Sequence, residues 1–232
     1  MHEQTLKLAA LWAREQERDA LLAERAGLEA GVRRQQRQLA DARALAASTE
    51  SQLKALQDEE RRRTERMNVA AKRRDTTQRL IDEGRASDYA AAMKQVELSK
   101  AVVDEEEDAL LPLYDQLEAA QTAATGAASG VKVVEGRLRE AEAKLAERAP
   151  GVAEALVPAT AARDAARDGI HREWLNRYDD LRKKNMGVFG DVRDGVCQGC
   201  SVKLVPTELA EHRRGVATHY CKSCGRFLGE LL

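Results

Sequence analysis

The chain has 232 residues, of which 33% are charged and only 3% are aromatic, and its formal net charge is −1. Eight aromatic rings are too few for the single compact core of an enzyme of this length. The balanced charge excludes a global positive field that would hold nucleic acid or an anionic membrane. A composition rich in Ala, Leu, Glu and Arg instead favours long helices and coiled coils.

The N-terminal residues do not form a basic segment followed by an apolar one, so the sequence predicts no secretory signal. No window approaches the roughly 20 apolar residues of a membrane span. We therefore expect a cytoplasmic protein that does not enter a membrane. In that reducing compartment, four clustered cysteines are expected to be metal ligands rather than disulfides.

Two long segments have apolar residues spaced alternately by three and four. Between about Leu6 and Ile81 there is no proline, and the apolar positions are Leu21, Leu28, Val32, Leu39, Ala42, Ala46, Leu53 and Leu56. In the second segment they are Leu110, Leu113, Leu117, Ala120, Ala124, Ala127, Val131, Val134, Leu138, Ala141 and Leu145. A sustained repeat of 3.5 residues predicts two long helices, each with a narrow seam that faces another helix.

A short connection at 82–88 separates the two helical segments. Gly84 can end a helix in the left-handed conformation, and Ser87 or Asp88 can cap the next one. A short link between two long heptad segments predicts an antiparallel hairpin. If the turn is centred there, the numbers of facing residues sum to about 171, and Leu53 lies opposite Leu117.

The same register places the acidic run 104–108 opposite Arg61, Arg62, Arg63 and Arg66. Taken alone, the arginine run can be interpreted as a nucleic-acid patch, and the acidic run as a metal site or a tail motif. Because the two runs face each other, we favour cross-helix ion pairs that fix the register, each exposed pair stabilising by about 0.2–1 kcal/mol.

Nearer the turn, further cations form a candidate surface for nucleic acid or a partner: Lys72, Arg73, Arg74 and Arg79. Over 67–100, seven Lys or Arg against five Asp or Glu leave only +2, which is a weak nucleic-acid signal. The second helix also contains Pro112 and three glycines, Gly126, Gly130 and Gly136. We expect these small residues to let the two helices approach closely; a flexible arm is the alternative.

The second helix is predicted to end at Ala149-Pro150-Gly151, with a break near 150–158 that leaves residues 1–20 without a hairpin partner. Pro158 then opens a third helix over 159–186, which ends near Gly187. We expect this helix to cover the start of the first one, at Leu8, Leu11 and Trp12. The predicted domains are a helical region, 1–186, and a C-terminal one, 190–232.

The four cysteines have the pattern C-x2-C-x20-C-x2-C, at Cys197, Cys200, Cys221 and Cys224. Two such knuckles present four thiolates at the corners of a tetrahedron, which suits one Zn²⁺. Gly199 and Gly225 are expected to provide the turn conformations, and 201–205 and 227–228 to form short strands. A redox dithiol would explain only one pair. With four thiolates no position remains open, so the zinc is predicted to be structural.

His219 lies two residues before a cysteine and is an alternative ligand, whereas the other histidines are expected at the surface. The predicted ribbon has nearly balanced charge, which favours modest phosphate binding at best. A local cationic patch is the candidate binding surface there: Arg213, Arg214, Lys222 and Arg226, with Tyr220 and Phe227. Docking to a protein is the other possibility for a ribbon of this kind.

The chain resembles the bacterial C4-type zinc-ribbon proteins with a long N-terminal coiled-coil hairpin, which are often described as nucleic-acid-binding. The most specific segments are 195–200, 204–206 and 221–228, and the segment 87–97 is similar to the one that follows the family's turn. Lys222 stands where proline is common, and Val205 where a second proline often precedes Pro206. The resemblance implies a role linked to transcription or RNA, and some relatives are linked to sigma-54-type factors and flagellar gene expression.

The sequence thus predicts a mainly α protein, with a long antiparallel coiled-coil hairpin and a small C-terminal β zinc ribbon. We expect a non-enzymatic adaptor that binds RNA, DNA or a transcription-associated or RNA-handling protein. The alternative is a purely protein-binding scaffold, or a chaperone-like partner of a sigma factor, without direct nucleic-acid contact. The sequence shows no Ser/His/Asp set, no Gly-rich phosphate loop and no open metal position, so we expect neither catalysis nor a small-molecule substrate.

Overall fold

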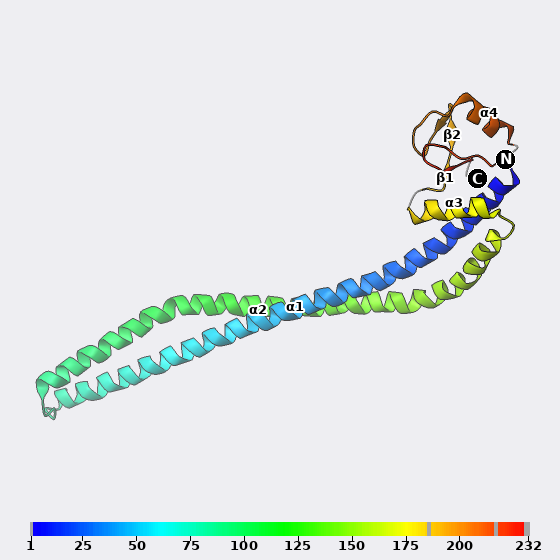
Figure 1. Cartoon of the computed structure of the whole chain (residues 1–232). Coiled ribbons are helices and arrows are strands. Elements are labelled where there is room, and N and C mark those ends of the chain that lie inside the picture. The colour runs from blue at the N-terminus through cyan, green and yellow to red at the C-terminus, as the bar shows by residue number, and fades with distance from the viewer. Residues whose placement is uncertain (1, 185–186, 216–217, 230–232) are drawn as a thin grey trace. The chain divides into compact units, whose positions relative to one another are not determined.

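The computed structural model describes residues 2–184, 187–215 and 218–229. Two long helices, α1 (Glu3–Asp82) and α2 (Tyr89–Arg167), pack as an antiparallel hairpin (Figure 1). A short helix, α3 (Arg172–Lys183), follows, and the C-terminal region contains short strands and one more helix. The mainly α fold class is confirmed. Within the described residues, no helix has an apolar stretch long enough to cross a membrane.

Packing divides the chain into two compact units, described here separately. One is the hairpin unit, 31–142, and the other is the base unit, which combines 1–30 with 143–232. This division differs from the predicted regions 1–186 and 190–232. The reason is that both ends of the hairpin share one core with the C-terminal region.

The hairpin turn lies where the sequence predicts it. Gly84 has a φ of 66°, and the N–H of Arg85 donates to the carbonyl of Leu80 at 2.9 Å, which closes the end of α1. The carboxylate of Asp88 accepts a hydrogen bond from the N–H of Ala91 at 3.0 Å and so caps the start of α2.

In the hairpin unit, Val32, Leu39, Leu110 and Leu113 of the predicted seam are buried, and its other residues are half-buried. Buried Ala70 and Val103 continue the seam towards the turn. Fewer ion pairs join α1 to α2 across the seam than the sequence predicts. Glu106 alone of the acidic run pairs with α1, accepting from Arg66 at 2.6 Å and Arg63 at 3.2 Å, whereas Arg61 and Arg62 pair with acidic residues of their own helix. Short i,i+3 contacts within one helix therefore compete with pairing across the hairpin.

Gly126, Gly130 and Gly136 do not serve close approach of α1 and α2. No atom of the described chain beyond each glycine's own helical surroundings lies within 4 Å of where a Cβ would stand. The expectation that these glycines let the two helices approach closely is therefore wrong, and the space beside them is open.

Helix α2 does not break at 150–158. It runs through Pro150 and Pro158 to Arg167, and the third helix begins only at Arg172. A proline in a helix removes one hydrogen bond and costs about 3 kcal/mol, which tertiary packing can offset. Here Val152 is buried, and contacts with α1 continue past the expected break, as in the 3.2 Å pair of Arg163 with Glu15. The start of α1 consequently has a hairpin partner.

Helix α3 also ends earlier than predicted, at Lys183 with Lys184 as its C-cap, whereas the predicted end at 185–186 lies outside the described residues. As expected, α3 covers the start of α1. The shared core consists of Leu8, Leu11, Ile170, Tyr178, Leu181, Val188, Phe189 and Phe227. Trp12 and Trp174 pack against it, and the Trp174 ring lies 6.1 Å from the rings of Tyr220 and Phe227.

One buried carboxylate joins three helices of the base unit. Glu15 of α1 has a side chain only 4% exposed, and it accepts from the hydroxyl of Tyr178 at 2.9 Å. Arg163 of α2 and Arg182 of α3 approach the same carboxylate at 3.2 and 3.0 Å. Burial and the neighbouring Glu15 raise the pKa of Tyr178 well above its ordinary value, so its hydroxyl remains a donor.

The C-terminal region is built from two-residue strands. β1 (Phe189–Gly190) pairs in parallel with β4 (Phe227–Leu228), and β2 (Val192–Arg193) pairs antiparallel with β3 (Val196–Cys197). The predicted strand at 201–205 is reduced to a single bridge between Lys203 and Val196. An additional helix, α4 (Pro206–Arg214), begins with proline at its first turn and ends at Gly215, whose φ is 63°.

The pairing of Glu106 makes a pH-dependent prediction for the hairpin. The Arg66 guanidinium lowers the pKa of the Glu106 carboxyl from its ordinary 4.5. Because this pKa is lowered on folding, the stabilisation is present above about pH 4.5 and is lost as the pH falls through the folded-state value. We expect Glu106→Gln to destabilise the hairpin by about 1 kcal/mol at neutral pH and far less at about pH 3.

Thermal unfolding followed by circular dichroism at the two pH values measures this difference. Glu107→Gln is the matched control, because Glu107 is exposed and makes no ion pair within the described chain. Equal destabilisation by the two substitutions would show that Glu106 does not hold the register.

Candidate metal centre

Two similar turns position the cysteines. In each, the first cysteine's carbonyl accepts a 2.7 Å hydrogen bond from the residue after the second cysteine: Ser201 donates to Cys197, and Gly225 donates to Cys221. Both donors have positive φ, 61° for Ser201 and 77° for Gly225. The expectation for Gly225 agrees with this geometry. In the first turn, however, the left-handed residue is Ser201 and not Gly199.

The four sulfur atoms lie together, all within 4.8 Å of one another. The Sγ atoms of Cys197 and Cys224 are 3.9 Å apart, and those of Cys200 and Cys221 are 3.7 Å apart. A tetrahedron with Zn–S bonds of about 2.3 Å has edges of about 3.8 Å, so the spacing fits a single zinc ion. None of the four cysteines forms a disulfide. The described chain contains no second such group of potential metal ligands.

Ionisation of the thiols differs around the cluster. The backbone N–H of Val202 lowers the pKa of the Cys200 thiol to about 7. Burial raises the pKa of Cys224 to about 12 and also raises that of Cys197. Four thiolates this close together repel one another, so a bound cation is needed for all four to be ionised at neutral pH.

Arg226 ties the first turn to the chain before it. Its Nε donates to the carbonyl of Gly187 at 2.9 Å, and its Nη1 donates to the carbonyl of Gly199. A Cβ on Gly199 would stand 2.5 Å from the guanidinium, so glycine is required here for the close approach of Arg226. The sequence proposed Arg226 as a partner-binding cation; in the structure it is half-buried, and its guanidinium is held by backbone carbonyls of the ribbon and of the chain before it.

The other predicted ribbon cations are more accessible. Lys222 is exposed, and its Nζ lies 3.5 Å from Glu208. Arg213 and Arg214 lie exposed at the end of α4, where Nε of Arg214 donates to the carbonyl of Ala210 at 3.4 Å. These three residues come from α4 and the second turn.

In the hairpin unit, the predicted cations lie along the last turns of α1. Lys72, Arg73 and Arg79 are exposed, and none of them forms an ion pair within the described chain. Arg74 pairs with the adjacent Asp75 at 2.9 Å. Three of the four proposed side chains therefore remain available to solvent.

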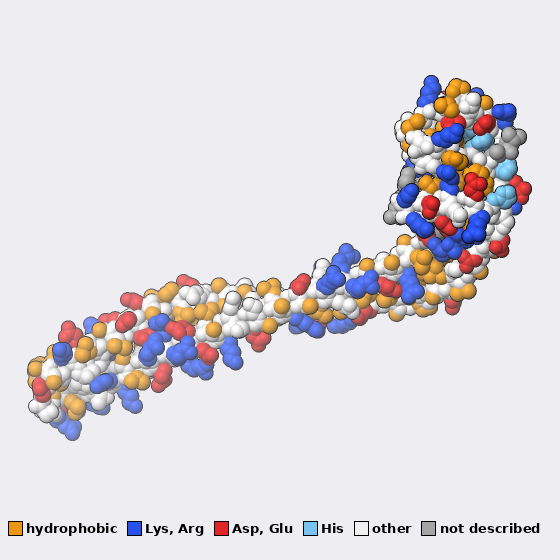
Figure 2. All heavy atoms as spheres, viewed as in Figure 1, with side chains coloured by type: hydrophobic (Ala, Val, Ile, Leu, Met, Phe, Trp, Pro, Cys, Tyr) orange, Lys and Arg blue, Asp and Glu red, His pale blue; other side chains and the backbone are white. Residues whose placement is uncertain are grey.

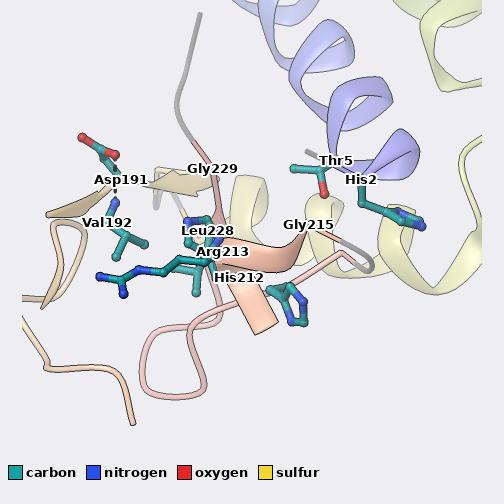
Figure 3. A pocket seen from close by; sticks show the side chains of 10 residues that line it. His2, Thr5, Asp191, Val192, His212, Arg213, Gly215, Leu228 and Gly229 are labelled. Carbon is teal, nitrogen blue, oxygen red and sulfur yellow. Dashed lines mark hydrogen bonds between the residues drawn. The ribbon is translucent and has the colours of Figure 1, made fainter. Parts of the chain in front are cut away.

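A cavity of about 250 Å³ lies between α4 and the start of α1 in the base unit (Figure 3). Its polar lining includes His2, Thr5, His212, Arg213 and His219. In Figure 3 the Arg213 side chain extends towards Val192, whereas His2 points to the opposite side, so these two side chains do not converge. His219 does not belong to the metal-ligand group. The alternative of a histidine ligand is therefore not supported.

The contacts of Arg226 predict a role in holding the metal. Substitutions in the shell behind metal ligands typically lower affinity 10- to 100-fold, so we expect Arg226→Ala to release the ion about 10–100 times more readily. Gly199→Ala should act in the same direction, because the added methyl displaces Arg226. Competition with a chromogenic chelator measures the effect. Arg193→Ala is the control, since Arg193 is exposed and paired with Asp191; an equal effect of this control would contradict the role.

No model of a protein family and no curated protein matches the chain. Solved structures share its fold, among them the following three. The HP0958 protein from Helicobacter pylori CCUG 17874 aligns with a TM-score of 0.63 at 13% identity, over 97% of this chain and 95% of that one. CT398 from Chlamydia trachomatis aligns with a TM-score of 0.60 at 17% identity, over 97% and 98%. A protein from Mycobacterium smegmatis aligns with a TM-score of 0.50 at 17% identity, over 98% of both chains. At these identities the likeness concerns the fold, which the chain shares over nearly its whole length.

Proposed function

We propose that the chain is a non-enzymatic zinc-ribbon coiled-coil adaptor. The observation that carries this proposal is the closed set of four sulfur atoms, spaced as the corners of one tetrahedron. In such a site all four ligand positions are protein thiolates, so no position remains for a water or a substrate. A bound Zn²⁺ would therefore act as a structural cross-link.

The apolar packing around the cysteines supports a structural role. Apart from the cysteines, the buried members of this cluster among the described residues are Leu204 and Leu228. So small a cluster contributes little hydrophobic stabilisation, and small metal domains gain the remainder from metal binding. A cytoplasmic location would keep the thiols reduced and available for zinc.

For the partner, we propose nucleic acid as the first candidate. The exposed and unpaired cations Lys72, Arg73 and Arg79 support it, because phosphate contacts draw their affinity from such side chains. Arg213 and Arg214 provide accessible cations on the ribbon. The family resemblance implies the same class of role.

A protein-binding scaffold, such as a partner of a sigma factor, is the second candidate. It is favoured by the intramolecular contacts of Arg226 and Lys222, which reduce the cationic surface of the ribbon. The formal net charge of −1 also offers no long-range attraction for a polyanion.

Loss of metal tests the zinc site. Cys197→Ser and Cys221→Ser should each lose stoichiometric zinc, because each removes one of four thiolate ligands. Elemental analysis of the purified variants gives the zinc content. Ser223→Ala, which lies between two ligands and removes none, should keep one zinc per chain. Full zinc content in both cysteine variants would rule out the ribbon assignment.

Salt dependence tests the nucleic-acid partner. We expect the chain to bind single-stranded RNA or DNA at low salt, and removal of three phosphate contacts to lower the slope of log affinity against log salt by about 2–3. The triple variant Lys72→Ala, Arg73→Ala, Arg79→Ala provides this measurement by fluorescence anisotropy. The control is Arg61→Ala with Arg62→Ala, because both arginines are paired within α1.

No binding at low salt would exclude the first candidate. Independently of that titration, purification from lysate with and without nuclease distinguishes the two candidates. A co-purifying protein that persists after nuclease treatment supports the scaffold, and its loss supports nucleic acid.

A further inference from the structure

The hairpin unit has a second apolar stripe beside its seam. On α2, the buried seam includes Ser99, Val103 and Leu110. Residues just before the seam positions repeat at the same alternating spacing: Leu98, Val102, Glu105, Ala109, Pro112, Gln116, Ala119, Ala123, Gly126, Gly130 and Val133. Only Glu105 in this series is charged. At a rise of about 1.5 Å per residue, the stripe runs for about 50 Å.

Helix α1 contributes to the same side of the hairpin. Arg43 and Glu135, which form a 2.8 Å pair across the hairpin, each directly follow a seam position. On both helices, residues directly after a seam position in the sequence therefore lie on one side of the hairpin. Residues directly before a seam position lie on the other side. The large exposed apolar residues of α1 in this unit all precede a seam position: Leu45, Val69 and Leu80. With Leu98, Val102 and Val133 of α2 they form one face, here called the flank face.

The flank face is exposed. Leu45 and Val69 are each 58% exposed, and Leu98 and Val133 are each 54% exposed. Gly126 and Gly130 lie on the same face beside open space, although each glycine costs a helix about 1 kcal/mol relative to alanine. The hairpin itself does not use the room these glycines leave. A further helix packed on the flank face would use it.

The net charges of α1 and α2 indicate which helix would pack on the flank face. Within 31–82, thirteen Lys or Arg against eight Asp or Glu give α1 a net +5, whereas within 89–142, five against eleven give α2 a net −6. Figure 2 shows basic side chains gathered mainly along α1 of the hairpin and acidic ones along α2. A polyanion on this face would meet the acidic helix. A second hairpin of the same sequence, with its α1 over this α2, brings opposite charges together at both contacts.

We propose that the flank face binds a second copy of this chain. Two hairpin units related by a two-fold axis then form a four-helix arrangement in which each α1 packs on the partner's α2. The contact is self-complementary and closed, as a two-fold interface requires. The exposed apolar residues of the flank face become buried, and the rim brings the basic α1 of one copy beside the acidic α2 of the other.

Sedimentation equilibrium of the full chain over a range of micromolar concentrations tests this proposal. We expect the mass of two chains, with a dissociation constant that rises with salt. The variant Leu98→Glu with Val133→Glu should raise that constant at least about 100-fold, because each substitution acts twice in a symmetric dimer. The matched control is Leu111→Glu with Tyr114→Glu, since these exposed residues of α2 directly follow seam positions and lie on the other side.

A second variant checks the close packing. Gly126→Leu with Gly130→Leu should keep the helical circular-dichroism signal, because the sites are open in the single chain, and should still dissociate the dimer. Cys197→Ser should remain dimeric, which separates this proposal from the zinc site. The mass of one chain at every concentration would overturn the proposal. So would equal dissociation by the flank variant and its control, or a monomer that captures a different protein through this face.

Discussion

The heptad seam between α1 and α2 is the interaction from which the remaining structure follows. Neither helix can bury its narrow apolar stripe alone, so the two helices must pair. Their antiparallel register brings residues 3–30 beside residues 143–167. That pairing places Glu15 within reach of Arg163 and sets the start of α1 against α3. The base unit is assembled on this pairing, since its core draws residues from both ends of the hairpin and from the strands next to the cysteines.

Local signals in the sequence were sufficient where one residue determines the geometry. Gly84 and Asp88 identify the turn, and the cysteine spacing identifies the metal-ligand group, because backbone conformation and thiolate chemistry depend on residue type. The path of α2 through Pro150 was not predictable in this way, because packing against α1 outweighs a strong local breaker. Pro206 and Gly215 mark the two ends of α4, so this helix was predictable from these two residues.

The contacts that individual side chains make were the least predictable part of the site. The sequence predicts Arg226 as a surface cation, but its guanidinium donates hydrogen bonds to two backbone carbonyls. Ser201 adopts a left-handed conformation that is more usual for glycine. Of the acidic run 104–108, likewise, only Glu106 forms ion pairs across the seam. Counting charges therefore overstates the surface open to a phosphate backbone. The proposed adaptor would depend on a metal-held ribbon and on a hairpin whose two helices carry opposite net charge.

The division into two units also bears on how this architecture can vary. The base unit is discontinuous in sequence, and the hairpin unit is an insertion within it. Because the seam repeats every seven residues, deletion or duplication of one heptad in each helix preserves the phase of both stripes. Hairpin length can thus change in paired steps of about 10 Å while every contact of the metal centre and of Glu15 is retained. The length of the hairpin can in this sense vary independently of the rest of the fold.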